Sequence, residues 1–173
     1  MNKIQAHLIG DLVTSNSSDA YTLQQKSSFG ERVENKVQYS TVEALYLAER
    51  NKLEILDSRN KNLSIDNLQK RFQHIDKKFK LKYTVFKDLR NKGYIVKTAL
   101  KFGAEFRVYP KGSSPGKAHS KWIVFTDHES KTFNWHEFSS KNRVAHSTKK
   151  NLLLAIVDEE SDVTYYEIKW IKP

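Results

Sequence analysis

Three side chains in the second half of this sequence carry groups that could together break an RNA phosphodiester bond: Tyr109, His119 and Lys150. RNA supplies its own nucleophile, the 2′-hydroxyl beside each phosphate. Cleavage therefore needs a base that removes this proton, an acid that protonates the 5′-oxygen, and a cation that stabilises the developing charge. No metal ion is required if these three groups converge.

The residue patterns around Tyr109 and His119 put both at strand edges. Alternation in Glu105–Tyr109 places Tyr109 on the polar face with Arg107, opposite Phe106 and Val108. The loop 110–118 follows, rich in Gly, Ser and Pro, and ends at His119. Histidine suits proton transfer near neutral pH. A strand tyrosine is more often a packing residue, however, and a histidine at a loop end is more often a surface residue.

Lys149 and Lys150 immediately precede Leu152–Val157, a continuous apolar run that is typical of a strand buried on both faces. A lysine pair at the entrance of a strand is most often solvated. The order Tyr, His, Lys within one basic region is therefore suggestive of an active site without identifying one.

A metal-dependent nuclease is the rival interpretation of the same region. Asp158 or Asp162, followed by Glu167 and Lys169, imitates an acidic site that could hold Mg²⁺. A solvated strand explains the alternation of Glu167 and Lys169 equally well. The sequence contains no Gly-rich phosphate loop, no G-x-S-x-G elbow and no H-E-x-x-H motif.

Composition limits the class of protein. The 173 residues contain no cysteine, which excludes disulfides, cysteine zinc sites and thiol catalysis. No apolar run approaches the roughly 18 residues of a membrane span, and no secretory signal is visible, so we expect a cytoplasmic protein. Residues 1–78 carry 12 basic and 10 acidic side chains, whereas residues 79–173 carry 18 and 10. A basic half interleaved with aromatic residues suggests a polyanion partner, most simply nucleic acid.

The expected elements divide near residue 78. The first forty residues are predicted to form short strands and turns, with a polar turn at Asn16–Asp19. Ser40 with Glu43 predicts a capping box and a helix to Arg50. Further predictions are a strand at Leu53–Leu56, a helix starting at Ser64 and a helix over Asp76–Asn91.

Beyond Gly93 the apolar period changes from helical to two. This predicts a strand–strand–strand–helix–strand–strand order and an α/β or α+β sandwich with a mixed sheet. The predicted strands are Tyr94–Lys97, Glu105–Tyr109, Lys121–Phe125, Leu152–Val157 and Val163–Ile171, with a helix at Trp135–His146.

Several segments together resemble the archaeal tRNA-splicing endonuclease family. The most specific is YTVFKDLRNKGYIVKTALKFGAEFRVY at Tyr83–Tyr109, supported by STVEALYL at Ser40–Leu47, His119-Ser120, RVAHSTKKNL at Arg143–Leu152, and the final TYYEIKWIKP. The resemblance covers nearly the whole chain and is weakest over residues 1–39. One departure is Ala99, where the family commonly has glycine.

The resemblance implies roles for particular residues. Tyr109 matches the general base, His119 the general acid, and Lys150, rather than Lys149, the charge-stabilising lysine. Arg143 matches an arginine that packs on an unpaired RNA base at the opposite subunit's site. An acidic loop that docks on a partner's basic groove corresponds to Asp158, Glu159, Glu160 and Asp162.

The resemblance also implies an architecture and a reaction. We expect a small α+β domain at 1–78 and a restriction-endonuclease-like catalytic domain at 79–173, with a mixed sheet flanked by helices. The reaction would be metal-free and cofactor-free excision of introns from precursor tRNA at bulge-helix-bulge motifs, leaving 2′,3′-cyclic phosphate and 5′-hydroxyl ends. A homotetramer is expected, with a heterotetramer containing a paralogous subunit as the runner-up. A non-catalytic, RNA-binding subunit remains the other alternative.

Overall fold

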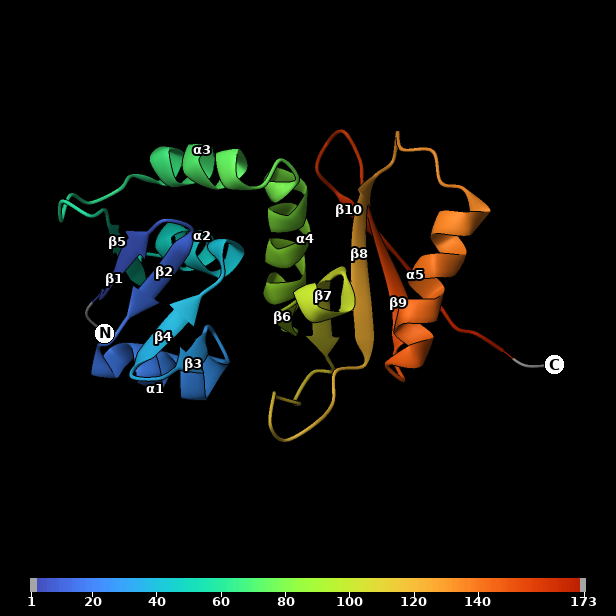
Figure 1. The fold of residues 1–173 in the computed structure, drawn as a ribbon, viewed down its shortest axis with the longest axis horizontal. Coiled ribbons are helices and arrows are strands. Elements are labelled where there is room, and N and C mark those ends of the chain that lie inside the picture. Colours follow the sequence, from blue (N-terminus) through green and yellow to red (C-terminus); the bar gives the residue numbers. More distant parts are fainter. Residues whose placement is uncertain (1–2, 172–173) are drawn as a thin grey trace. The chain divides into compact units, whose positions relative to one another are not determined.

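A computed structural model describes residues 3–171 of the chain, which form two compact units with the division between Lys80 and Leu81. Each unit contains a five-stranded sheet with both parallel and antiparallel pairs, and helices pack beside the strands (Figure 1). The predicted α+β organisation with mixed sheets is therefore confirmed. Within residues 3–171, no helix is long and apolar enough to cross a membrane.

The first unit has the sheet order β3-β4-β2-β1-β5, in which only the pair of β1 and β5 is parallel. Its elements are β1 (Ile4–Ile9), β2 (Leu12–Ser15), α1 (Ser18–Ser27), β3 (Glu31–Val33), β4 (Lys36–Tyr39), α2 (Thr41–Glu49), β5 (Leu53–Leu56) and α3 (Ile65–Ile75).

The capping box predicted at the start of α2 is confirmed. The Ser40 hydroxyl accepts from the backbone N–H of Glu43, and the Glu43 carboxylate accepts from the backbone N–H of Ser40. Two donors that a helix start leaves unpaired are thereby satisfied. The predicted strand at Leu53–Leu56 and the predicted helix cap at Ser64 are confirmed as β5 and α3.

Helix α1 was not predicted, and the expectation of strands and turns over the first forty residues is wrong there. Ser17, inside the predicted polar turn, is the helix N-cap, and its hydroxyl accepts from the backbone N–H of Ala20. Only Ala20 and Leu23 of this helix are buried. A helix that buries so few side chains leaves almost no apolar periodicity for sequence reasoning to detect.

The second unit is built on the sheet β10-β9-β8-β7-β6. Its elements are α4 (Phe79–Asn91, whose first two residues belong to the first unit), β6 (Ile95–Ala99), the short 3₁₀ turn η1 (Leu100–Phe102), β7 (Ala104–Tyr109), β8 (Trp122–His128), α5 (Trp135–Ser147), β9 (Asn151–Val157) and β10 (Val163–Ile168). The last strand is three residues shorter than predicted. Helix α4 starts at Phe79 rather than Asp76, because Asp76 is the C-cap of α3.

Helices α4 and α5 cover opposite faces of this sheet (Figure 1). Phe106 of β7 packs against Phe86 of α4, with ring centroids 5.9 Å apart. On the other face, Ala145 of α5 shares a buried cluster with Ile123 of β8 and Leu152 of β9. Strands β8 and β9 are parallel, and α5 forms the crossover between them. Ala99 has φ −128°, outside the left-handed region that favours glycine, so its backbone does not require glycine there.

Candidate active site

One edge of the second sheet gathers the ends of three strands. Strand β7 runs antiparallel to β8, and β8 runs parallel to β9. The carboxyl end of β7 therefore lies at the same edge as the amino ends of β8 and β9. The register is continuous across this edge, since Val108 pairs with Trp122 and Trp122 pairs with Asn151. Tyr109, His119 and Lys150 each lie within three residues of this row.

Tyr109 is the last residue of β7 and is paired with Ile95 of β6. It shares a face with Arg107, whose pairing partner Ile123 belongs to the core beneath α5. The predicted face is right, but the side chain is not on an open surface: Tyr109 is only 4% exposed. Among the described residues, none forms a hydrogen bond with its hydroxyl.

His119 is exposed and stands just before β8. The preceding loop folds through two turns, in which Ser113 N–H donates to Pro110 and Ala118 N–H donates to Ser114. After the loop, the backbone N–H of Lys121 donates to the carbonyl of Val108 at 2.9 Å. This hydrogen bond brings Lys121 next to Val108, the neighbour of Tyr109. His119, two residues before Lys121, therefore lies near the end of β7.

Lys150 joins α5 to β9. Its backbone N–H donates to Ala145 and its ammonium donates to the Thr148 carbonyl, both at 2.9 Å. The ammonium also lies 5.9 Å from the centroid of the Phe102 ring, which packs on the α5-side core. Lys149, by contrast, is exposed and has a left-handed backbone with φ 56°. Lys150 is thus the half-buried lysine, held by the carboxyl end of α5.

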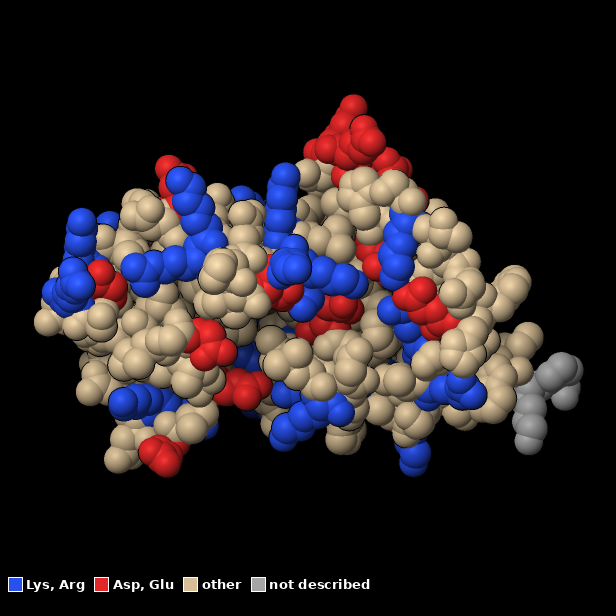
Figure 2. Space-filling view, turned by 45° about the horizontal axis from the view of Figure 1, so that its top comes forward, with Lys and Arg blue, Asp and Glu red and all other residues tan. Residues whose placement is uncertain are grey.

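The remaining predicted residues lie at two places, one near this edge and one far from it. Arg143 is exposed on α5, near the end of that helix from which Lys150 follows. The acidic loop is the tip of the β9–β10 hairpin, closed by hydrogen bonds from the N–H groups of Asp158 and Asp162 to each other's oxygens. Figure 2 shows these acidic side chains projecting as one cluster. The length of β9, about 20 Å at ~3.3 Å per residue, separates this tip from Lys150.

The acidic pairing that a metal-dependent nuclease would require is not formed. Glu167 pairs with Leu153 near the Lys150 end of β9, whereas Val163, next to Asp162, pairs with Val157 at the hairpin end. Four residues of strand correspond to roughly 13 Å, and two carboxylates so separated cannot bind one ion whose ligands lie about 2.0–2.6 Å away. Within residues 3–171, no three His, Asp or Glu side chains are grouped so that they could hold one metal ion.

Two pockets at this edge were not predicted. One, of about 240 Å³, lies beside Lys150 and is lined by Asn142, His146, Lys149, Lys150, Asn151, Ile168, Lys169 and Trp170. The other, of about 210 Å³, lies on the α4 side and is lined by Leu89, Lys92, Tyr94, Val108, Trp122, Leu153, Tyr165 and Glu167. Trp122 and Glu167 are 45 positions apart in the sequence and meet only through the pairing of β8, β9 and β10. No local pattern indicates such a contact.

Comparison with known proteins matches both units to domains of the same enzyme family. The family model for the catalytic C-terminal domain of tRNA intron endonuclease matches residues 79–165, and the model for the N-terminal domain of that enzyme matches residues 4–69. The matches leave few of the described residues outside the family pattern.

Archaeal relatives match along nearly their whole length. The tRNA-splicing endonuclease of Thermococcus kodakarensis is 42% identical over 167 residues, covering 96% of this chain and 97% of the relative. That of Methanothermobacter thermautotrophicus is 41% identical, with 99% of both chains covered. That of Nanoarchaeum equitans is 42% identical over 152 residues, covering 84% of this chain and 97% of the relative. On these matches, the chain is a member of the tRNA intron endonuclease family.

Proposed function

We propose that this protein excises introns from precursor tRNA by cutting bulge-helix-bulge motifs, without a metal ion, to 2′,3′-cyclic phosphate and 5′-hydroxyl ends. The observation that carries the proposal is the meeting of three strand ends, bearing Tyr109, His119 and Lys150, at one sheet edge in a chain of this family. Transfer of the phosphoryl group to the 2′-oxygen requires a base, an acid and a cation.

Each residue has one role in the proposed reaction. Tyr109 removes the proton of the 2′-hydroxyl, and the 2′-oxygen attacks the adjacent phosphorus. The bond from phosphorus to the 5′-oxygen breaks, and His119 donates a proton to that oxygen. The Lys150 ammonium stabilises the additional negative charge on the phosphate oxygens. The half-buried position of Lys150 supports this role, since an ion pair is stronger where water is partly excluded.

The proposal extends to assembly. Arg143 is exposed and free to stack on an unpaired base, a contact that guanidinium groups make readily. The projecting acidic tip of the β9–β10 hairpin suits docking on a basic surface of another subunit, which supports a homotetramer. A heterotetramer with a paralogous subunit is the runner-up.

The test is cleavage of an end-labelled bulge-helix-bulge RNA by the purified chain in EDTA, with wild type beside His119→Ala. His136→Ala is the matched control, because His136 is also exposed and lies away from the edge, at the start of α5. We expect wild type and the control to give cyclic-phosphate ends at equal rates, and His119→Ala to lose the activity.

Other outcomes would overturn parts of the proposal. Cleavage that EDTA abolishes would mean that a metal ion takes part. Full activity of His119→Ala would remove the assigned acid. Absence of cleavage by wild type, restored by adding a paralogous subunit, would replace the homotetramer with the heterotetramer. If that mixture cut equally well with His119→Ala, this chain would be the non-catalytic partner.

A further inference from the structure

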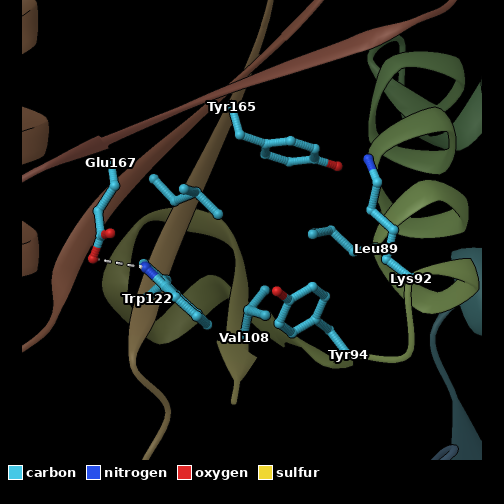
Figure 3. Close-up of a pocket in the computed structure, with 8 residues that line it drawn as sticks. Leu89, Lys92, Tyr94, Val108, Trp122, Tyr165 and Glu167 are labelled. Atoms are coloured by element: carbon cyan, nitrogen blue, oxygen red, sulfur yellow. Dashed lines mark hydrogen bonds between the residues drawn. The ribbon is translucent and has the colours of Figure 1, made fainter. Parts of the chain in front are cut away.

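The pocket of about 210 Å³ on the α4 side of the second sheet has aromatic walls and an apolar floor (Figure 3). Tyr94 and Trp122 meet edge to face, with ring centroids 5.9 Å apart and planes at 89°. Tyr165 lies across the opening from them (Figure 3). Leu89, Val108 and Leu153 supply the aliphatic part of the lining, and Lys92 and Glu167 its charged part. A planar aromatic ligand therefore finds ring surfaces on more than one side.

A lysine ammonium group lies over each of the three rings. The ammonium of Lys111 lies 5.2 Å from the centroid of Tyr94, that of Lys121 lies 4.4 Å from Trp122, and that of Lys92 lies 5.0 Å from Tyr165. Three ammonium groups thus lie beside an apolar pocket, and that of Lys92 is also paired with the Asp88 carboxylate at 2.6 Å. Aromatic faces for bases, combined with cations for the backbone, are the means by which proteins bind single-stranded nucleic acid.

Glu167 adds a directed acceptor to this pocket. Its Oε1 accepts hydrogen bonds from Trp122 Nε1 at 3.1 Å and from the Asn151 side chain. Both of these hydrogen bonds, and the contact with Lys121 at 3.9 Å, reach Oε1, which leaves Oε2 for a ligand. The Asn151 hydrogen bond, assisted by Trp122 and Lys121, holds the pKa of Glu167 below its ordinary value. The carboxylate is therefore charged at neutral pH.

The pocket adjoins the candidate active site through the sheet itself. Val108 and Leu153 line the pocket, while their chain neighbours Tyr109 and Leu152 face the α5 side. Asn151, which holds Glu167, is the residue after Lys150. The pocket thus lies on the opposite face of the sheet from Tyr109 and from Lys150, whose ammonium lies near Phe102 of the α5-side core.

We propose that this pocket binds one unpaired base of the substrate RNA near the cut, and that Glu167 selects bases with an exocyclic amino group. The proposal rests on the proposed function, since it deepens the substrate recognition of the same enzyme. Adenine, guanine and cytosine each carry such an amino group, and uracil has none. Glu167 Oε2 accepts from this group while the base stacks against the rings, and Lys111 and Lys121 contact the neighbouring phosphates.

The experiment measures binding in a background that cannot cut. Each unpaired nucleotide of a bulge-helix-bulge RNA is changed in turn to A, C, G, U or an abasic site, and affinity for His119→Ala is measured by fluorescence anisotropy. At one position we expect the abasic RNA to bind about tenfold more weakly, the size expected for one stacked base. Uridine at that position should bind several-fold more weakly than the other three bases.

Variants of the pocket separate recognition from folding. Glu167→Gln is expected to remove the discrimination against uridine while keeping the abasic penalty, because the rings remain. Trp122→Phe keeps a ring but loses the Nε1 donor that orients Glu167, so it should reduce the discrimination in part. Asp11→Asn is the matched control, since Asp11 is an exposed carboxylate in the β1–β2 turn and the change of charge is the same. Circular dichroism checks that each variant is folded.

The outcomes distinguish this proposal from the proposed function. If base identity affects binding to His119→Ala equally with and without Glu167→Gln at every position, the pocket is not the base site, even where wild type cuts the RNA. If the pocket is instead filled by a second copy of the chain, an abasic change will have no effect that depends on Trp122 or Glu167. A wild type that does not cut, but shows the Glu167-dependent preference, would remove the proposed reaction and keep the base pocket.

Discussion

At the scale of single residues, Tyr109 combines a buried ring with a hydroxyl that the described residues do not engage. The ring completes the end of β7, where Tyr109 pairs with Ile95. Packing and chemistry therefore reside in different atoms of the same side chain, and a substitution that deletes only the hydroxyl can separate them.

Tyr109→Phe is expected to lower the single-turnover cleavage rate by about 10²–10⁴-fold, the range for loss of a general base. The free energy of unfolding should change by less than about 1 kcal/mol, because the ring remains. Rapid-quench assays and urea denaturation check the two parts. Tyr21→Phe, in α1, is the control for loss of a phenol elsewhere. A wild-type rate in Tyr109→Phe would assign the base to another group.

The choice between Lys149 and Lys150 shows how far sequence reasoning reaches at this scale. Both lysines stand before an apolar strand, and only the resemblance to the family favours Lys150. The structure adds a physical difference: Lys150 is anchored to the Thr148 carbonyl, whereas Lys149 occupies the exposed left-handed turn. Neither difference is encoded in local composition, because both depend on how α5 ends against β9.

At the scale of elements, Glu43 connects the start of α2 with a distant turn. Besides its capping-box contact with Ser40, its carboxylate accepts from the backbone N–H of Gly30 at 3.0 Å, and the side chain is buried at 4% exposure. Gly30 has φ +72°, and an added Cβ would lie 2.5 Å from Val37 Cγ1, so only glycine fits there. The local capping box was predictable, but the contact with Gly30, 13 positions away, was not.

Glu43→Ala is expected to lower the free energy of unfolding of the first unit by about 2–4 kcal/mol. The change removes charge-assisted hydrogen bonds and leaves the N–H groups of Gly30 and Ser40 without this acceptor. Chemical denaturation followed by circular dichroism measures the effect. Asp66→Asn, at an exposed site in the first turn of α3, should cost less than about 0.5 kcal/mol. Equal effects of the two substitutions would show that the buried carboxylate is not a structural link.

Elements with strong caps or strong apolar periods could be predicted from the sequence, whereas α1 could not. A few neighbouring residues are enough to predict the helices capped by Ser40 and Ser64 and the strands of period two after Gly93. Helix α1 buries only the side chains of Ala20 and Leu23, and its N-cap Ser17 lies in a cluster of Ser, Asn and Asp that equally suits a turn. Its position depends on packing against β3 and β4, which no local window contains.

At the scale of the whole molecule, the charge distribution is uneven in a way that bears on assembly. The chain carries a net charge of +10, yet the β9–β10 hairpin concentrates acidic side chains at one projecting tip. Glu129, just after β8, joins this tip, because its carboxylate accepts from the backbone N–H of Glu159. A strongly acidic tip on a basic protein is complementary to much of the surface of a second copy.

Glu159 and Glu160 are the residues with which to test this docking. Both are exposed, whereas Asp158 holds the turn by accepting from the N–H of Asp162 at 2.8 Å, so reversing only the two glutamates leaves the hairpin closed. The double variant Glu159→Lys, Glu160→Lys is expected to sediment at a smaller mass than wild type, because like charges then meet at the docking surface. Wild type should dissociate in part as salt is raised from 0.1 to about 0.5 M, since exposed charges are screened over about 10 Å or less.

Asp11→Lys with Asp66→Lys makes the same change of charge on the first unit and should leave the mass unchanged. If both double variants sediment as wild type does, the acidic tip has no part in assembly, and any tetramer must form through other surfaces.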